Sequence, residues 1–299
     1  MRRNGLSGEF AFIEALRALA SHPAARGLMD DAAVLEVGGE TLILTHDMMV
    51  EGVHTLPGQA PQDIAWKLVA INLSDLAAKG AQPLGVLIGH MLGPDDSLFI
   101  KGLEEVLEHY SVPLLGGDTV AGGPPRAFGL TGIGRATCTP VPSRSGARVG
   151  DRLCITGPIG AAMMGFEALK NGTKEDSSAY RRPAALLAEG QALAPHVSAM
   201  MDISDGLLLD AWRMAQASGV TLAIESGAVP LATPETRRAD AMRWGEDYQL
   251  LFTAPAASRL PIAAHIIGDV VPQKDAPLLL DGVPAGTSET LGYQHDAGR

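Results

Sequence analysis

Hydrophobic and polar residues follow two different spacings along the chain. Phe10, Ile13, Leu16 and Leu19 recur at helical spacing, which predicts a helix over residues 9–20. Elsewhere, short apolar runs are bounded by Gly, Pro or Asp, a pattern typical of strands. In the first half we predict strands over residues 32–37, 41–47, 83–92, 112–120 and 126–137, and further helices over 61–80 and 95–110.

A polar segment, PVPSRSGARVGD at residues 140–151, divides the chain and is typical of a connection between domains. We therefore predict one domain over residues 1–142 and a second over 143–299. In the second domain we expect strands over 152–157, 197–204, 220–225 and 263–271, a strand-like run after residue 247, and helices over 160–172 and 205–219. Strands that alternate with helices in both halves predict an α/β fold with two layers.

The charge of the chain limits its partners. It has 34 Asp and Glu residues against 23 Lys and Arg, a formal net charge of −11. This acidity disfavours binding to nucleic acids and anionic membranes, so we expect neither partner. The two cysteines, Cys138 and Cys154, are too few for a disulfide framework. Residues 1–20 lack the apolar core of a signal peptide, and these features together predict a cytoplasmic protein.

Acidic residues at the ends of apolar segments are the main candidates for chemistry. Each one alone is typical of a turn or a helix N-cap. Several in one chain favour a common site, where uncompensated carboxylates would cost on the order of several kcal/mol. Mg²⁺ with a polyphosphate would supply the missing positive charge, since Mg²⁺ prefers hard oxygen ligands. These acids are Asp30, Asp31, Asp47, Asp75, Asp118, Asp202 and Asp205.

Other polar residues offer phosphate or substrate contacts. Lys79 lies on the same face of the predicted helix as Asp75, which fits either a phosphate contact or a solvated face with an internal ion pair. Arg144 and Arg148 either reach a phosphate between the domains or lie in a solvated linker. The turn GGDTV has glycines that permit close approach to a phosphate, although the chain has no Walker sequence.

The remaining patterns exclude some classes of enzyme. Residue spacing supports no Ser-His-Asp arrangement. Paired carboxylates also occur in glycosidases, but sugar sites usually have aromatic platforms, and this chain is only 4% aromatic. Glu246 and Asp247 precede a strand-like run and either bind a substrate or form a turn beside a buried Tyr248.

Several motifs together resemble the thiamine-monophosphate kinase family of the aminoimidazole ribonucleotide synthetase-like superfamily. The stretches are DDAAVL, DMMVEGVH, NLSDLAAKGAQP, LLGGDT, SRSGARVGD, MMDISDGLLLD, GEDYQLLF and GYQH, and the resemblance covers residues 9–295. It implies a two-domain α/β (α+β) fold whose N-terminal strands contribute to a dimer β-barrel, so a homodimer is expected. It also implies a phosphotransferase that uses ATP and Mg²⁺ to convert thiamine monophosphate into thiamine diphosphate by direct in-line transfer.

The resemblance further implies roles for individual residues. Several Mg²⁺ ions would be held by Asp31, Thr45, His46, Asp47, Asp75, Asp118, Asp202 and Asp205. ATP would contact Tyr110, Gly117, Asp118, Arg144 and Ser204. Thiamine monophosphate would contact His54, Glu246 and Tyr293. The residues expected to be most directly catalytic are Asp75, Asp118 and Asp205.

Some positions depart from the family pattern. Met29 replaces a usual Gly, and His46 replaces a small hydroxyl residue, which matters little if this position binds metal through its backbone carbonyl. Thr55 and Trp244 replace a usual Phe and a usual Gly near the expected thiamine pocket, so they leave the exact acceptor open. The choice between Asp30 and Asp31 as metal ligand is also open.

Two further expectations concern the DISD motif, Asp202 to Asp205. It resembles NLSD, Asn72 to Asp75, which suggests that each domain contributes one such turn to a shared metal cluster. Asp210 follows it within the predicted helix, and we expect it on the helix surface without a catalytic role.

Alternatives to the kinase interpretation are another ATP-dependent enzyme of the superfamily acting on a different small phosphorylated substrate, or a non-catalytic binder of nucleotide or thiamine diphosphate. A structural dimerisation protein would leave the acids unexplained.

Overall fold

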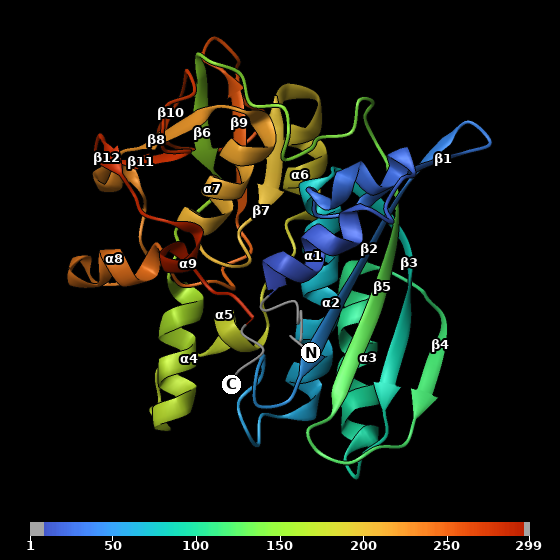
Figure 1. Ribbon diagram of the computed structural model, residues 1–299. Coiled ribbons are helices and arrows are strands. Elements are labelled where there is room, and N and C mark those ends of the chain that lie inside the picture. Colours follow the sequence, from blue (N-terminus) through green and yellow to red (C-terminus); the bar gives the residue numbers. More distant parts are fainter. Residues whose placement is uncertain (1–8, 296–299) are drawn as a thin grey trace, which may run out of the picture.

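Two mainly antiparallel sheets, one in each half of the chain, form the framework of the protein (Figure 1). The computed structural model describes residues 9–295, so the outermost residues of both predicted domains lie outside the described part. Segment 137–150 connects the last strand of the first sheet to the first strand of the second, and the predicted boundary at residues 142 and 143 falls within it. No helix among the described residues is long and apolar enough to cross a membrane.

The N-terminal sheet has the strand order β1-β2-β5-β3-β4, and only β3 and β4 run parallel. Its strands are β1 (Ala33–Val37), β2 (Glu40–Val50), β3 (Ala81–Met91), β4 (Leu114–Val120) and β5 (Ala127–Ala136). The helices of this half are α1 (Glu9–Arg17), the short 3-10 helix η1 (Pro23–Leu28), α2 (Pro61–Ala78) and α3 (Asp96–Tyr110). Every residue of β4 is exposed at the edge of the sheet.

The C-terminal sheet has the order β12-β11-β8-β10-β6-β9-β7, with β8 and β11 parallel. Its strands are β6 (Asp151–Ile155), β7 (Ala199–Asp202), β8 (Thr221–Ile224), β9 (Leu250–Pro255), β10 (His265–Val271), β11 (Leu278–Leu280) and β12 (Val283–Pro284). The α-helices are α4 (Ala161–Asn171), α5 (Ser178–Arg181), α6 (Leu187–Leu193), α7 (Leu207–Ser218), α8 (Arg238–Ala241) and α9 (Ser288–Leu291). Short 3-10 turns are η2 (Ala194–His196), η3 (Ser226–Ala228) and η4 (Glu235–Arg237).

The two-domain α/β (α+β) class predicted from the sequence is confirmed. The long helices and strands occur where hydrophobic spacing predicted them, within a few residues at each end. The very short strands β11 and β12 were not predicted, because two or three residues are too few to show a periodic pattern.

Helix α2 lies between the two sheets and determines how they meet (Figure 1). Ile64 and Leu68 pack in the core of the N-terminal half, whereas Ala77 and Ala78 pack with Phe252 on the C-terminal sheet. A helix that is apolar on nearly all sides is suited to such a buried position. Packing on both sides therefore fixes α2 relative to β7, whose last residue is Asp202.

Helix α4 begins without a capping side chain of its own, because Gly160 occupies the N-cap position. The distant Asp247 replaces it: its carboxylate accepts the N–H groups of Gly160 at 2.7 Å and Ala162 at 3.2 Å. The first N–H groups of a helix have no partner within the helix, so this contact satisfies two of them. It also ties the turn around Asp247 to α4.

We expect Asp247→Ala to lower the free energy of unfolding by about 1–2 kcal/mol, as loss of an N-cap does. Burial raises the pKa of Asp247 to about 6, so denaturant unfolding should be measured at pH 7.5, where the carboxylate is ionised. Asp240→Ala is the matched control, because Asp240 is exposed and its carboxylate pairs with Arg237 on the surface. An equal loss of unfolding free energy in both variants would show that the contact between Asp247 and α4 stabilises the protein no more than a surface ion pair does.

Candidate active site

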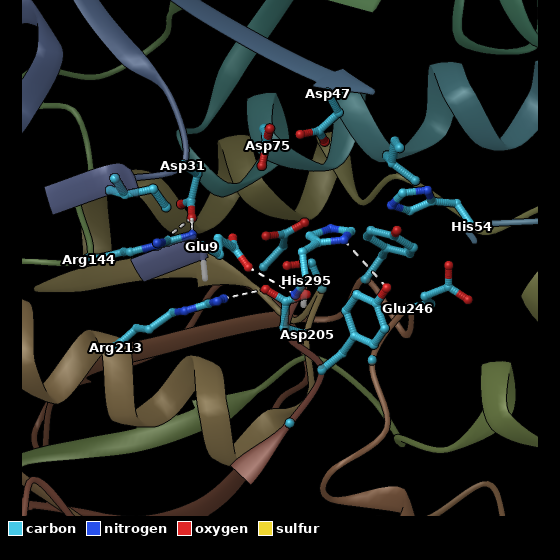
Figure 2. Close-up of a pocket in the computed structure, with 18 of the residues that line it drawn as sticks. Glu9, Asp31, Asp47, His54, Asp75, Arg144, Asp205, Arg213, Glu246 and His295 are labelled. Carbon is cyan, nitrogen blue, oxygen red and sulfur yellow. Dashed lines mark hydrogen bonds and ion pairs between the residues drawn. The ribbon is translucent and has the colours of Figure 1, made fainter. Parts of the chain in front are cut away.

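A cavity of about 790 Å³ lies between the two halves of the chain. Its walls come from α1, β2, α2, the turn after β7, the segment around residue 245 and the C-terminal segment around residue 293. Figure 2 shows Arg144 and Arg213 at one side of a group of carboxylates, and His54 and Glu246 at the other side. The cavity therefore has two chemically different ends.

Three of the carboxylates expected as metal ligands lie close together in this cavity. Oxygen atoms of Asp31, Asp75 and Asp202 lie within 4.8 Å of one another. The Ser74 hydroxyl on α2 donates to Asp202 Oδ2 at 2.6 Å, and the Thr45 hydroxyl on β2 donates to Asp75. These hydrogen bonds hold the carboxylates in place at the crossing of α2 and β7.

Fixed cations neutralise one side of this group. The Lys79 ammonium is fully buried and lies 2.5 Å from Asp30 and 2.6 Å from Asp31. Arg144 contacts Asp31 Oδ1 through Nε at 2.6 Å and Nη2 at 2.5 Å. Although burial opposes ionisation, Lys79 and Arg26 hold the pKa of Asp30 below its usual range. Both Asp30 and Asp31 line the cavity, and the carboxylate of Asp31 is the one that lies beside those of Asp75 and Asp202.

The other carboxylates have no such compensation. Among residues 9–295, Asp47, Asp75 and Asp202 form no ion pair with Lys or Arg side chains. Burial, together with nearby Asp205, raises the pKa of Asp47 to about 6, and burial with nearby Asp31 raises that of Asp202 to about 8. Burial and the carboxylates of Asp47 and Asp202 raise the pKa of Asp75 well above its usual value. Carboxylate oxygens that have no positively charged side chain beside them fit the binding of a divalent cation such as Mg²⁺.

The DISD turn is held by backbone hydrogen bonds from two other segments. The Ser204 carbonyl accepts the Glu246 N–H at 2.8 Å, and the Asp205 carbonyl accepts the Tyr293 N–H at 2.9 Å. Glycines permit this close approach: a Cβ at Gly245 would lie 2.2 Å from the Ser204 oxygen, and one at Gly292 would lie 2.3 Å from the Asp205 oxygen. One turn therefore positions residues at both ends of the cavity.

The expectation that Asp210 lies on the helix surface is wrong. Its side chain is fully buried, and Oδ2 accepts the N–H groups of Ser204 at 3.1 Å and Asp205 at 3.0 Å. Side chains in the first turn of a helix tilt towards its N-terminus, which brings this carboxylate back to the DISD turn. Burial raises its pKa to about 6.

The opposite end of the cavity combines one carboxylate with a buried cation. Glu246 forms an ion pair of 2.5 Å with Lys67, whose ammonium lies 3.9 Å from the ring centre of Tyr180. Burial raises the pKa of Glu246, and the Lys67 charge opposes this change. His54 accepts the Val50 N–H through Nδ1 at 3.0 Å, and burial lowers its pKa to about 4. His54 is therefore neutral at pH 7, with its proton on Nε2.

Aromatic rings line the same end. The rings of Phe166 and Trp244 are 5.1 Å apart, and Phe166 also contacts Tyr180 at 5.3 Å. The His295 ring lies 5.2 Å from His54 and 5.1 Å from Tyr293. A carboxylate surrounded by rings is suited to a flat cationic group.

The predicted residues divide into two groups in the single chain. Those that line the cavity are Asp31, Asp47, His54, Asp75, Arg144, Asp202, Ser204, Asp205, Glu246 and Tyr293. Thr45 contacts this group through Asp75. The residues outside the cavity are His46, Tyr110, Gly117 and Asp118.

The positions of the outside residues have simple causes. His46 bonds to Thr131 on the exposed outer face of the sheet, because strand residues alternate between faces and Thr45 and Asp47 face inwards. The Tyr110 hydroxyl accepts the Ala185 N–H at 2.8 Å. Gly117 and Asp118 lie on the exposed edge strand β4.

Two other expectations need correction. Lys79 is neither a free phosphate contact nor solvated, since it is buried against Asp30 and Asp31. The NLSD motif forms the interior of α2 and not a turn, although its Ser74 does bond to Asp202 of DISD. Of the departures in the pocket, Trp244 lines the cavity and Thr55 does not.

Sequence reasoning missed Lys67, Arg213, Tyr180 and Phe166 as residues of the site. For two of these residues, the sequence contains a pattern that indicates a role in the site. Lys67 interrupts an otherwise apolar stretch of α2, and a buried lysine requires a partner. Arg213 lies three residues after Asp210, a spacing that allows an ion pair on a helix.

Comparisons with known proteins identify the class. Residues 29–136 match the N-terminal domain of AIR synthase related proteins, and residues 148–276 match their C-terminal domain. The chain is therefore an AIR synthase related protein with both domains. It is 34% identical to thiamine-monophosphate kinase of Salmonella typhimurium and 32% identical to that of Escherichia coli, in each case over 91% of this chain and 92% of the relative. It belongs to the thiamine-monophosphate kinase family.

Solved structures agree with this assignment. A structure described as AaThiL complexed with AMPPCP and TMP matches with a TM-score of 0.87 and 29% identity, covering 99% of both chains. The hydrogenase maturation protein HypE of E. coli shares the fold, with a TM-score of 0.67 and 22% identity over 95% of this chain and 96% of HypE.

We expect Mg²⁺ binding to release protons and to strengthen as the pH rises from 6 to 8.5. Protons and Mg²⁺ compete for the same carboxylates, and the pKa of Asp202 is raised to about 8 and that of Asp47 to about 6. Titration calorimetry in buffers of different ionisation enthalpy measures the released protons. Asp202→Asn should reduce their number at pH 7, and an Mg²⁺ affinity independent of pH would contradict the compensation described above.

Proposed function

We propose that this protein transfers the γ-phosphoryl group of ATP to thiamine monophosphate and so forms thiamine diphosphate. The observation that carries the proposal is the two-ended cavity, with carboxylates and arginines at one end and Glu246 among aromatic rings at the other. The first end suits a metal-bound polyphosphate, and the second suits the cationic ring of thiamine. The names of the relatives and the AMPPCP and TMP in the matching structure support the same reaction.

Mg²⁺, when bound, supplies the positive charge that two anionic substrates need in order to approach each other. The carboxylates that would hold it are Asp31, Asp47, Asp75, Asp202 and Asp205, joined by the Thr45 hydroxyl and the His46 backbone carbonyl. Arg144 and Ser204 would contact the nucleotide from the turn side of the cavity. The whole arrangement is preorganised by α2 and β7, which lowers the cost of positioning in the transition state.

The acceptor would be oriented by His54, Glu246 and Tyr293. The neutral His54 can donate a hydrogen bond from Nε2, and Glu246 can pair with the thiazolium charge. A phosphate is already ionised at neutral pH, so its oxygen can attack the γ-phosphorus in line without a strong general base. Positioning and charge stabilisation then account for catalysis.

A homodimer would complete the site. Strand β1 pairs with residues 40–44 of β2, so within the described part of the chain residues 45–50 have a neighbouring strand on one side only. The other edge of the sheet is the exposed strand β4, which carries Asp118. Free strand edges favour pairing with another chain. Pairing of these two edges between copies would close a barrel and bring Asp118 of the partner subunit towards Asp47.

We further propose a cytoplasmic location. Cys138 and Cys154 form no disulfide, which is consistent with a reducing compartment that also contains ATP.

Product analysis by NMR after incubation with ATP, Mg²⁺ and thiamine monophosphate tests the reaction directly, and we expect thiamine diphosphate. Asp205→Asn should lower kcat by at least about a hundredfold, as expected for loss of transition-state charge stabilisation. Glu246→Gln keeps a hydrogen-bond acceptor for Lys67 and should mainly raise KM for thiamine monophosphate. An unchanged KM in Glu246→Gln would remove this residue from the acceptor site, and absence of product would refute the reaction.

Mixing two inactive variants tests the dimer. If Asp118 acts across the interface, Asp118→Asn and Asp205→Asn copies should together form mixed dimers with one intact site each. After exchange of subunits we expect about a quarter of the native activity, since about half of the dimers are mixed. No recovery, with mixed dimers confirmed by mass spectrometry, would show that Asp118 does not act in the partner's site.

A further inference from the structure

Arg213 is a cation of the cavity to which the resemblance assigns no role. It lies on α7 and reaches the carboxylates from the same side as Arg144 (Figure 2). Its side chain is 16% exposed, so it is largely desolvated yet still open to the cavity. A guanidinium in such a position interacts strongly with anions.

The two partners of Arg213 are held differently. Nη1 lies 3.0 Å from Oδ1 of Asp210, whose other oxygen accepts two backbone N–H groups of the DISD turn. Asp210 is fully buried and therefore immobile. The same Nη1 also donates to Asp205, whose side chain is 28% exposed and faces the cavity. The contact with Asp210 therefore anchors the guanidinium of Arg213, whereas the contact with Asp205 can be replaced by a contact with a ligand.

Arg144 and Arg213 also differ in which of their guanidinium N–H groups already have a partner. Nε and Nη2 of Arg144 are both engaged by Asp31. Within residues 9–295, the hydrogen bonds of Arg213 involve Nη1 alone. Its Nε and Nη2 groups thus remain for an anionic oxygen, and a guanidinium presents such donors in a planar fork that matches phosphate.

We propose that Arg213 binds a phosphate group of the nucleotide and that Asp210 holds it in position. In the ligand-free chain Arg213 neutralises Asp205. When Mg²⁺ binds Asp205, the arginine keeps its contact with Asp210 and turns its free donors to the nucleotide. The inference deepens the proposed function, on which it rests for the identity of the nucleotide.

A purely structural role makes a different prediction. Asp210 and Arg213 support the DISD turn, and this turn also holds Glu246 and Tyr293 through the carbonyls of Ser204 and Asp205. Loss of a turn support would therefore weaken binding at both ends of the cavity. Loss of a phosphate contact would weaken nucleotide binding alone.

The experiment compares the native protein with Arg213→Met, Arg213→Lys and the control Arg237→Met. Arg237 is a surface arginine paired with Glu167 and Asp240 outside the cavity. Titration calorimetry measures the affinities for AMPPCP with Mg²⁺ and, separately, for thiamine monophosphate, and a thermal melt measures ligand-free stability. We expect Arg213→Met to bind AMPPCP at least about tenfold more weakly, with thiamine monophosphate affinity within about twofold of native.

Arg213→Lys keeps the charge and should give an intermediate loss, whereas Arg237→Met should match the native protein. Unchanged AMPPCP affinity in Arg213→Met would overturn the proposal. Equal weakening of both ligands, together with a lower melting temperature, would also overturn it and assign Arg213 to the turn. If the native protein binds AMPPCP but forms no thiamine diphosphate, the proposed reaction fails while the role of Arg213 is still decided by these affinities.

Discussion

The site depends on the repulsion between carboxylates that the packing of the core holds close together. Helix α2 is fixed between two sheets, and its Asp75 is thereby held beside Asp202 at the end of β7. Carboxylates repel each other strongly where they are desolvated, and within residues 9–295 Asp47, Asp75 and Asp202 form no ion pair with a lysine or arginine. The raised pKa values of these acids express the remaining repulsion. The apolar core around α2 therefore holds these carboxylates together despite their repulsion.

Both halves of the chain contribute acids to one cavity. Asp47, Asp75 and Asp202 lie on regular elements, so their spacing is set by helix and strand packing, whereas Asp31 and Asp205 lie in turns. Loops and the C-terminal segment carry Glu246, Trp244 and Tyr293. Loops tolerate substitution better than packed elements do. Trp244, one of the departures from the family pattern, lies in such a segment.

Much of this site could be predicted from the sequence, because its acids lie in short motifs at the ends of apolar segments. Lys79 and Asp210 were misjudged because helical spacing does not reveal which face of a helix other segments cover: β7 lies against Lys79, and the DISD turn lies against Asp210. Arg213 and Lys67 were missed because their roles come from partners distant in sequence or from the depth of burial. Local patterns also did not reveal that Tyr110 and Asp118 lie outside the cavity of the single chain. The short strands β11 and β12 exist only through tertiary pairing.

The close backbone contacts at Gly245 and Gly292 limit how this protein can change. Any side chain at either position would meet a carbonyl oxygen of the DISD turn and displace Asp205. Their immediate neighbours, Trp244 and Tyr293, line the cavity. In each of these segments, a glycine that cannot take a side chain lies next to a residue whose side chain lines the cavity. An exchange of the Trp244 or Tyr293 side chain would therefore leave the glycine contacts with the DISD turn in place.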